Sequence, residues 1–226
     1  LISVENRDAP DLIEALGKNG IAIPPEIVAK LMAEPEKAPA VYLNLREIEQ
    51  VVRLLADQRS PLLAEVMTRN ARSASPDVCE AVARAECTIN GLVDPWEFAL
   101  QQADKLGIDN VSDPVRHVVL LSHLIVQVEN GGISQFFTNG YGEDWFLTLD
   151  ALKAVGAAHT HAIMKTSVEK FGPEGPPLED YNEAVAALHQ KLDDPWKDET
   201  SEFYKDGDRR WALIYRYILA NREHFE

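Results

Sequence analysis

An apolar segment at residues 118–128, interrupted only by Ser122, His123 and Gln127, most constrains the fold of this chain. It is shorter than the roughly 20 residues that a membrane-spanning helix needs. A helix that is apolar almost all round is usually buried among other helices. The sequence then reads Glu129-Asn130-Gly131-Gly132, where glycine can supply the left-handed residue that ends a helix. We therefore expect a buried central helix, followed by a separate short helix.

Helix-start signals surround this segment. Asp94, Asp113 and Asp194 each precede a proline, which predicts an aspartate cap followed by proline at the first helical position. Strand signals are nearly absent, and apolar residues at three- and four-residue spacing predict further helices. We expect these at 145–155, 158–171, 179–192, 196–205 and 209–221. The predicted fold is all-α, a multi-helix bundle with a buried central helix and a smaller helical N-terminal region.

The N-terminal region is expected to contain short helices at 11–18, 25–32, 45–58 and 61–72. In the third, Leu45, Ile48, Val51, Val52 and Leu55 recur on one helical face. Ser73-Ala74-Ser75-Pro76 is the best candidate linker. We predict a helical region of unknown role at 1–75 and a second domain at 76–226.

The two cysteines bear on the cellular compartment. Cys79 and Cys87 lie in one predicted helix, so a rise of about 1.5 Å per residue places them roughly 12 Å apart. That distance is too long for a disulfide. With no secretory signal and no long apolar run, we expect a cytoplasmic protein. The first residue is Leu1 and not methionine, so the possibility that a leader sequence was removed stays open.

The chain is strongly acidic, with a net charge of −15. Residues 77–150 hold 12 acidic and 3 basic side chains, and residues 171–208 hold 11 and 3, whereas residues 1–76 hold 11 and 9. Two negative blocks repel nucleic acid and anionic membranes, and they attract basic proteins, including those that bind DNA. We therefore expect neither direct nucleic-acid binding nor membrane binding. A purely solubilising role for these charges stays open.

No catalytic, metal or cofactor motif emerges. His117 and His123 are six residues apart and point to different sides of a helix, and the chain has no His-Glu-x-x-His pattern. The glycine pairs lack the preceding strand of a phosphate-binding loop, and no Gly-x-Ser-x-Gly elbow is present. We expect no catalytic residue, no metal and no cofactor, and we expect His123 to be a hydrogen-bonded core histidine.

The candidate partner-binding residues are acidic. Asp198, Glu202 and Asp206 are four apart and Glu199 lies beside them, so they would form a stripe on one helix. With about 6 Å between charges, this stripe is sparser than a DNA strand, which has a phosphate about every 3.4 Å. Imitating DNA therefore requires acids from other elements on the same face, and the candidates are Glu143, Asp144, Glu179, Asp180 and Glu183.

Residues 126–140 carry a family resemblance. The residues of this signature are Asn130, Gly131, Gly132, Gln135, Phe136, Phe137, Asn139 and Gly140. After them come Gly156-Ala157, a glycine- and proline-rich loop at 171–177, and an acidic helix with Phe203-Tyr204. In this order they resemble the C-terminal domain of the bacterial DNA-mimic protein family, a domain of unknown function, over about residues 85–221. The sequence departs from the pattern at Ile133 and at Gly140-Tyr141.

The resemblance implies a helical fold in which the signature residues are structural. It also implies a non-enzymatic role, in which an acidic surface imitates DNA and occupies a basic or DNA-binding protein such as a transcription regulator. Fold transfers between relatives better than function, so two alternatives stay open. One is an immunity- or antitoxin-like inhibitor. The other is an enzyme with a pocket near His123, Glu129 and Gln135. The sequence does not indicate the oligomeric state.

Overall fold

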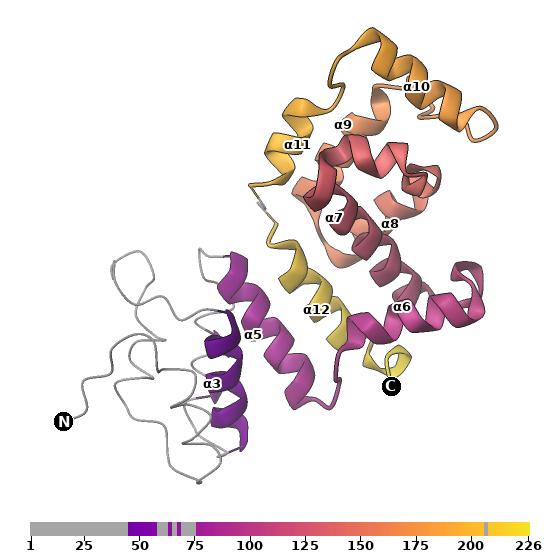
Figure 1. Ribbon diagram of the computed structural model, residues 1–226. Coiled ribbons are helices and arrows are strands. Elements are labelled where there is room, and N and C mark those ends of the chain that lie inside the picture. The colour runs from indigo at the N-terminus through magenta and orange to yellow at the C-terminus, as the bar shows by residue number, and fades with distance from the viewer. Residues whose placement is uncertain (1–44, 58–62, 65–66, 69–75, 206–207) are drawn as a thin grey trace, which may run out of the picture. The chain divides into compact units, whose positions relative to one another are not determined.

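The computed structural model describes residues 45–57, 63–64, 67–68, 76–205 and 208–226. These residues form nine α-helices and no strand, which confirms the all-α prediction (Figure 1). The chain divides into two compact units, Leu1–Val93 and Asp94–Glu226. The helices predicted at 11–18 and 25–32, and most of 61–72, lie outside the described residues.

The first unit contains α3 (Leu45–Asp57) and α5 (Pro76–Ile89), which pack against each other. Val51, Val52 and Leu55 are almost fully buried, and all three belong to the predicted apolar face. Arg53 on α3 donates a hydrogen bond to Thr88 Oγ1 on α5 over 3.2 Å. The boundary predicted at 75–76 therefore falls between two helices of one unit, whereas the compact units divide after Val93.

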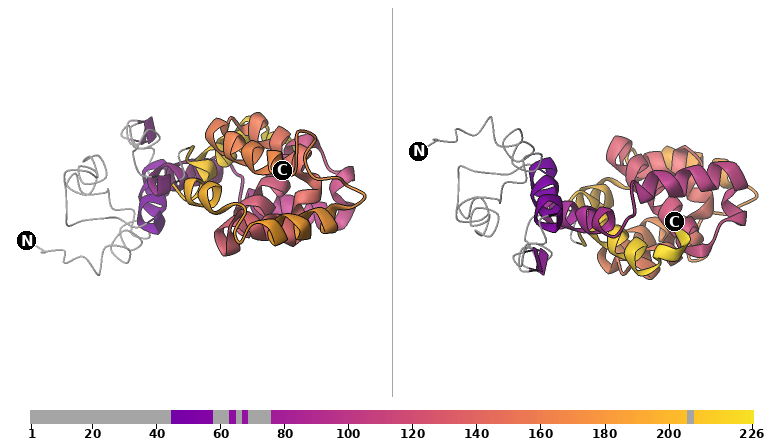
Figure 2. Two further views of the ribbon diagram at one scale, coloured as in Figure 1. Left: turned by 90° about the horizontal axis from the view of Figure 1, so that it is seen from above. Right: turned by 90° about the horizontal axis from the view of Figure 1, so that it is seen from below.

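The second unit is a bundle of seven helices, and Figure 2 shows it from two further sides. They are α6 (Pro95–Leu106), α7 (Asp113–Thr138), α8 (Trp145–Val155), α9 (Ala158–Glu169), α10 (Tyr181–Lys191), α11 (Lys197–Phe203) and α12 (Arg210–Ala220). Three short 3₁₀ turns accompany them, η2 (Ile108–Asn110), η3 (Tyr141–Asp144) and η4 (Arg222–His224). Helix α7 contacts α6, α8, α10, α11 and α12.

Helix α7 is the buried central helix that the apolar segment predicts. Val118, Leu121, Leu124, Ile125 and Val128 are each 1% exposed or less. Among the described helices, none combines the length and the apolar character that crossing a bilayer requires. Gly131 and Gly132 have non-helical backbone angles, so a kink at the glycine pair separates the central helix from a short helical segment that runs to Thr138, as the sequence predicts.

The aspartate caps differ from the prediction. Asp94 occupies the cap position of α6 in a left-handed conformation, without a side-chain capping hydrogen bond. Ser112 holds the cap position of α7, and Asp113 is its first helical residue. Asp194 accepts a long 3.4 Å bond from the Trp196 amide, while α11 begins only at Lys197. The prolines mark the helix starts, because proline suits the first turn, but the aspartates do not act as regular side-chain caps.

An aromatic cluster fixes the second half of α7 within the bundle. The rings of Phe137 and Trp196 stack with centroids 4.6 Å apart, and Phe171 lies against both. Trp196 is fully buried and donates from Nε1 to the Ser167 carbonyl over 3.0 Å. Because Trp196 directly precedes α11, the cluster ties α7 and α9 to the start of the acidic helix.

Candidate functional site

The kink in α7 is held by side chains from the segment around α11. Gly132 has φ 75° and ψ 178°, which is a conformation that glycine adopts and that differs from the left-handed cap expected. Two backbone groups beside the kink form hydrogen bonds with side chains outside α7. The Ile133 amide donates to Thr200 Oγ1 over 3.1 Å, and the Tyr204 hydroxyl donates to the Val128 carbonyl over 2.8 Å. The glycine pair therefore creates a contact surface for α11.

The other signature residues also make contacts within the bundle. Gln127 Oε1 accepts hydrogen bonds from Gln135 Nε2 at 3.0 Å and from Asn139 Nδ2 at 2.8 Å, which spans the kink. Phe136 and Phe137 are buried, and the Phe137 carbonyl accepts from the Tyr181 hydroxyl at 2.8 Å. Gly140 has φ 82° and begins the turn into η3, while Asn130 is exposed at the kink.

The acids of α11 are largely paired with cations of the same chain. Glu199 is a mostly buried side chain, 13% exposed, and it lies 2.7 Å from Lys170 Nζ. Glu202 pairs with Lys205 and with His159 Nε2, and the Lys205 hydrogen bond is the main reason that its pKa is lowered. Asp198 is exposed, and Asp206 lies outside the described residues. A stripe of four free carboxylates is therefore not what α11 presents.

The remaining candidate acids lie in two elements, η3 and the start of α10. Glu143 and Asp144 lie in η3, Glu179 and Asp180 directly precede α10, and Glu183 lies in its first turn. We call these five residues the acidic face. Asp144 is half-buried and the other four are exposed.

Tyr181 joins the two halves of the acidic face. A Cβ atom added to Gly142 would lie 2.3 Å from the Tyr181 hydroxyl, so the η3 backbone rests directly on this side chain. Burial, and next the charge of Glu143, raise the pKa of Tyr181, which places that carboxylate within electrostatic reach. Within the described part of the chain, no lysine, arginine or histidine lies at ion-pair distance from the five carboxylates. Their charge is thus uncompensated.

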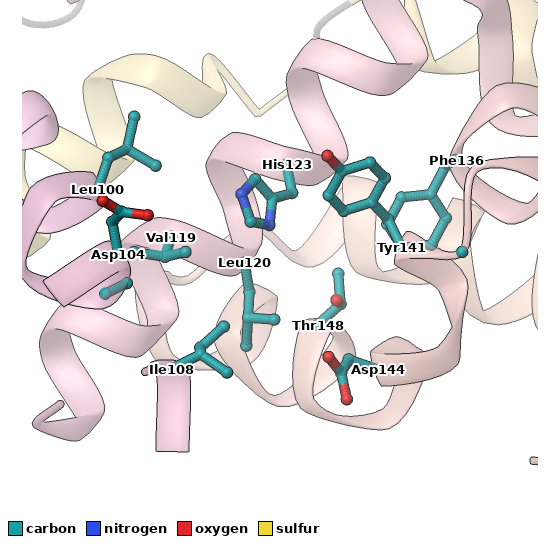
Figure 3. Close-up of a pocket in the computed structure, with 12 residues that line it drawn as sticks. Leu100, Asp104, Ile108, Val119, Leu120, His123, Phe136, Tyr141, Asp144 and Thr148 are labelled. Atoms are coloured by element: carbon teal, nitrogen blue, oxygen red, sulfur yellow. The ribbon is translucent and has the colours of Figure 1, made fainter. Parts of the chain in front are cut away.

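A pocket of about 380 Å³ borders this face. Asp144 belongs to both, and His123 lies in the middle of the pocket with its ring 4.7 Å from that of Tyr141 (Figure 3). Neither Glu129 nor Gln135 lines the pocket, so the structure does not bring together the three residues of the enzyme alternative. His123 is half-buried at a cavity, and no hydrogen bond to its ring occurs among the described residues, so the expected hydrogen-bonded core histidine is wrong.

The region from η2 to the end of α12 decides the family. A model of the family described as DMP19-like protein matches residues 109–221, half of the chain. The chain belongs to the DMP19-like protein family. This membership confirms the resemblance drawn from the signature residues, and it suggests DNA mimicry and a non-enzymatic role. No curated protein and no solved structure gives a significant match to the chain.

Inside the DMP19-like region, one serine–histidine pair is of the kind that serves as nucleophile and base in enzymes. Ser134 Oγ and His189 Nε2 lie 3.1 Å apart in a second pocket, which Gly131, Gly132 and Thr200 also line. An activated serine needs a base that a third group orients. Among the described side chains, none is hydrogen-bonded to the other nitrogen of His189, whose ring edge packs on Trp196. In this structure the pair connects α10 to α7.

Thiol and metal chemistry find no support in the described residues. Cys79 and Cys87 are buried and form no disulfide, and burial raises the pKa of Cys87 to about 12, so this thiol stays protonated. No group of three or more histidine, cysteine, aspartate or glutamate side chains in the described ranges is arranged to hold a metal ion. These observations leave the acidic face as the main functional candidate of this DMP19-like chain.

Two half-buried histidines make the stability of this DMP19-like chain depend on pH. His117 Nδ1 lies 2.7 Å from the Tyr217 hydroxyl, and burial lowers the pKa of His117 and of His123 below 6.5. As pH falls through 6.5, the unfolded chain takes up these protons before the folded chain does, so stability decreases. From pH 7.5 to 5.5, we expect the urea midpoint of His117→Gln to fall less than that of the unchanged chain.

The matched control for this prediction is His224→Gln, because His224 is exposed in η4. It should keep the full decrease of the urea midpoint between the two pH values. An equal decrease in all three proteins would contradict the assignment to His117.

Proposed function

We propose that this chain is a non-enzymatic DNA mimic, whose acidic face binds the DNA-contacting surface of a basic partner protein, such as a transcription regulator, in competition with DNA. The observation that carries the proposal is that Tyr181, at the start of α10, reaches η3 beside Glu143, so that two elements carrying five carboxylates meet without a cation of the described chain paired to them. Membership of the DMP19-like family supports it.

The electrostatic reason is simple. Surface carboxylates that are paired with lysine or arginine offer little to a partner, whereas uncompensated carboxylates attract basic surfaces and speed their association. Proteins that bind DNA gain much of their affinity by placing lysine and arginine against phosphates. An acidic face from two elements can meet several such cations at once. Asp198 adds a further exposed charge, while Glu199 and Glu202 contribute less because Lys170 and Lys205 already neutralise them.

The proposal also covers the cellular compartment and the cofactors that the function requires. We place the protein in the cytoplasm, where DNA-binding partners work and where the thiols of Cys79 and Cys87 stay reduced. The role needs no cofactor, no metal, no membrane and no direct contact with nucleic acid. An immunity-like inhibitor would use a similar acidic surface, so the identity of the partner separates the two functions.

The first test is capture of partners from the native lysate across a salt series, with two variants. The face variant carries Glu143→Gln, Glu179→Gln, Asp180→Asn and Glu183→Gln. An exposed charge contributes a few tenths of a kcal/mol, so four together should change the affinity for the partner about tenfold. We expect a basic, DNA-binding partner that is released as salt rises and that the face variant binds about tenfold more weakly.

The control variant removes the same number of negative charges from other elements of the second unit. It carries Asp109→Asn, Asp150→Asn, Glu169→Gln and Glu223→Gln, and it should bind like the unchanged chain. Equal weakening by both variants would mean that net charge acts and not the acidic face. Recovery of no basic partner at low salt would contradict the proposed function, and recovery of a toxin enzyme would favour the immunity-like alternative.

A further inference from the structure

The pocket beside the acidic face is built from five elements of the second unit, α6, η2, α7, η3 and α8. Its apolar walls come from α6, η2 and α7, and the residues of these walls are Leu100, Ala103, Ile108, Val119, Leu120 and Phe136. With a volume of about 380 Å³, it can hold a large side chain, because one water occupies only about 30 Å³ of liquid. Apolar walls of this kind suit the methylene stem of a long side chain.

The charged groups of the pocket are negative and therefore attract a cation. Figure 3 shows Asp104 and Asp144 on opposite sides of His123, and no lysine or arginine lines the cavity. Burial lowers the pKa of His123, so its ring is uncharged at neutral pH and does not repel a positive ligand. The pocket thus offers two carboxylates and no opposing charge from its own lining.

Two further features favour a planar cation over a compact one. The rings of His123 and Tyr141 lie 4.7 Å apart at an angle of 54°, and aromatic rings of this kind are surfaces on which a guanidinium stacks. Thr148 lines the pocket between Tyr141 and Asp144 (Figure 3), and it is 1% exposed. Its hydroxyl has no hydrogen-bond partner among the described residues, which is unusual for a buried polar group.

We propose that this pocket receives an arginine side chain from the DNA-contacting surface of the basic partner. The proposal rests on the proposed function and deepens it, since Asp144 connects the pocket to the acidic face. Arginine fits better than lysine, because its planar head offers five donors and stacks on rings, whereas the ammonium of lysine is a strongly hydrated point charge. Buried arginines are often the side chains that dominate the affinity of an interface.

The experiment uses the full chain and two peptides of equal length and equal charge. In one peptide, arginines alternate with alanines, and in the other, lysines replace all arginines. The dissociation constants are measured by calorimetry at low salt. We expect the arginine peptide to bind at least about fivefold more tightly, which is the size of a cation–π contact that is still partly exposed to solvent. The acidic face alone should not distinguish the two peptides.

Two variants assign this preference to the pocket. Ala103→Phe fills the cavity and should remove the preference while the lysine peptide binds as before. Asp104→Asn removes one carboxylate of the pocket and should weaken the arginine peptide about threefold, as expected for a partly exposed ion pair. The matched control is Asp109→Asn, because Asp109 is exposed in the neighbouring η2 and does not line the pocket. It should leave the preference unchanged.

A second measurement keeps the proposal testable if Ala103→Phe does not fold. Ethylguanidinium chloride should shift the ring proton signals of His123 and Tyr141 in nuclear magnetic resonance spectra, whereas sodium chloride at the same ionic strength should not. Equal salt-sensitive binding of both peptides, or unchanged ring signals, would overturn the proposal of an arginine pocket. Neither result would contradict the proposed role of the acidic face. If neither peptide binds at low salt, the proposed function itself fails. Shifts from ethylguanidinium without a peptide preference would indicate a small-molecule site and would also overturn the proposal.

Discussion

Trp196→Ala is expected to lower the free energy of unfolding of the second unit by about 4 kcal/mol, which is typical for removing a buried tryptophan. Trp196 is fully buried, and its ring stacks on Phe137 and lies against Phe171. The change also leaves the Ser167 carbonyl without its indole donor. Urea denaturation followed by circular dichroism measures the loss.

The control for this prediction is Trp145→Ala. Trp145 is a half-buried tryptophan of α8 that touches Phe146 and Gly175 but is not part of the Phe137 cluster. Trp145→Ala should lower the free energy of unfolding clearly less than Trp196→Ala does, because less apolar surface becomes exposed to water. A loss of less than about 2 kcal/mol for Trp196→Ala would show that the cluster does not organise the bundle.

Gly132→Ala is expected to cost about 3 kcal/mol, and it should also disturb the packing of α11. At φ 75° and ψ 178°, a residue with a Cβ atom is strained by about 1 to 3 kcal/mol. The added Cβ would also lie 3.1 Å from Thr200 Cγ2, on the side chain whose hydroxyl accepts from the Ile133 amide. Loss of that hydrogen bond adds about 1 kcal/mol. Thermal and urea denaturation measure the change.

Gly156→Ala separates the backbone strain from the contact. Gly156 also has a positive φ, 81°, but a Cβ atom added there meets nothing within 4 Å. Its replacement should cost only about 1 kcal/mol, the usual penalty for a left-handed residue with a side chain. Equal losses at the two glycines would mean that the contact with Thr200 contributes nothing.

The helices were predictable because their signals are local. Residues 145–155 form α8 as expected, and α9, α10, α11 and α12 begin and end within two or three residues of the expected ranges. Apolar spacing, glycine and proline determine these features within a few residues of chain. The continuation of α7 past Gly132 depends instead on Thr200 and Tyr204, which lie far along the sequence.

The functional surface was only partly predictable. The negative blocks are visible in the sequence, but which acids remain uncompensated depends on pairs that sequence spacing does not show. Lys170 reaches Glu199 across 29 positions. Asp208 accepts hydrogen bonds from the amides of His159 and Thr160, so it caps α9. Its carboxylate is therefore less accessible to a partner protein than an unpaired surface carboxylate. The pocket at His123 likewise requires five elements to meet.

The most direct test of DNA mimicry is a displacement titration with the basic partner bound to a labelled DNA duplex. Fluorescence anisotropy follows the release of the duplex as the chain is added. We expect release at low salt, weaker release as salt rises, and about tenfold weaker competition by the face variant. A stable complex of partner, duplex and chain, with no release of DNA at any concentration of the chain, would contradict DNA mimicry.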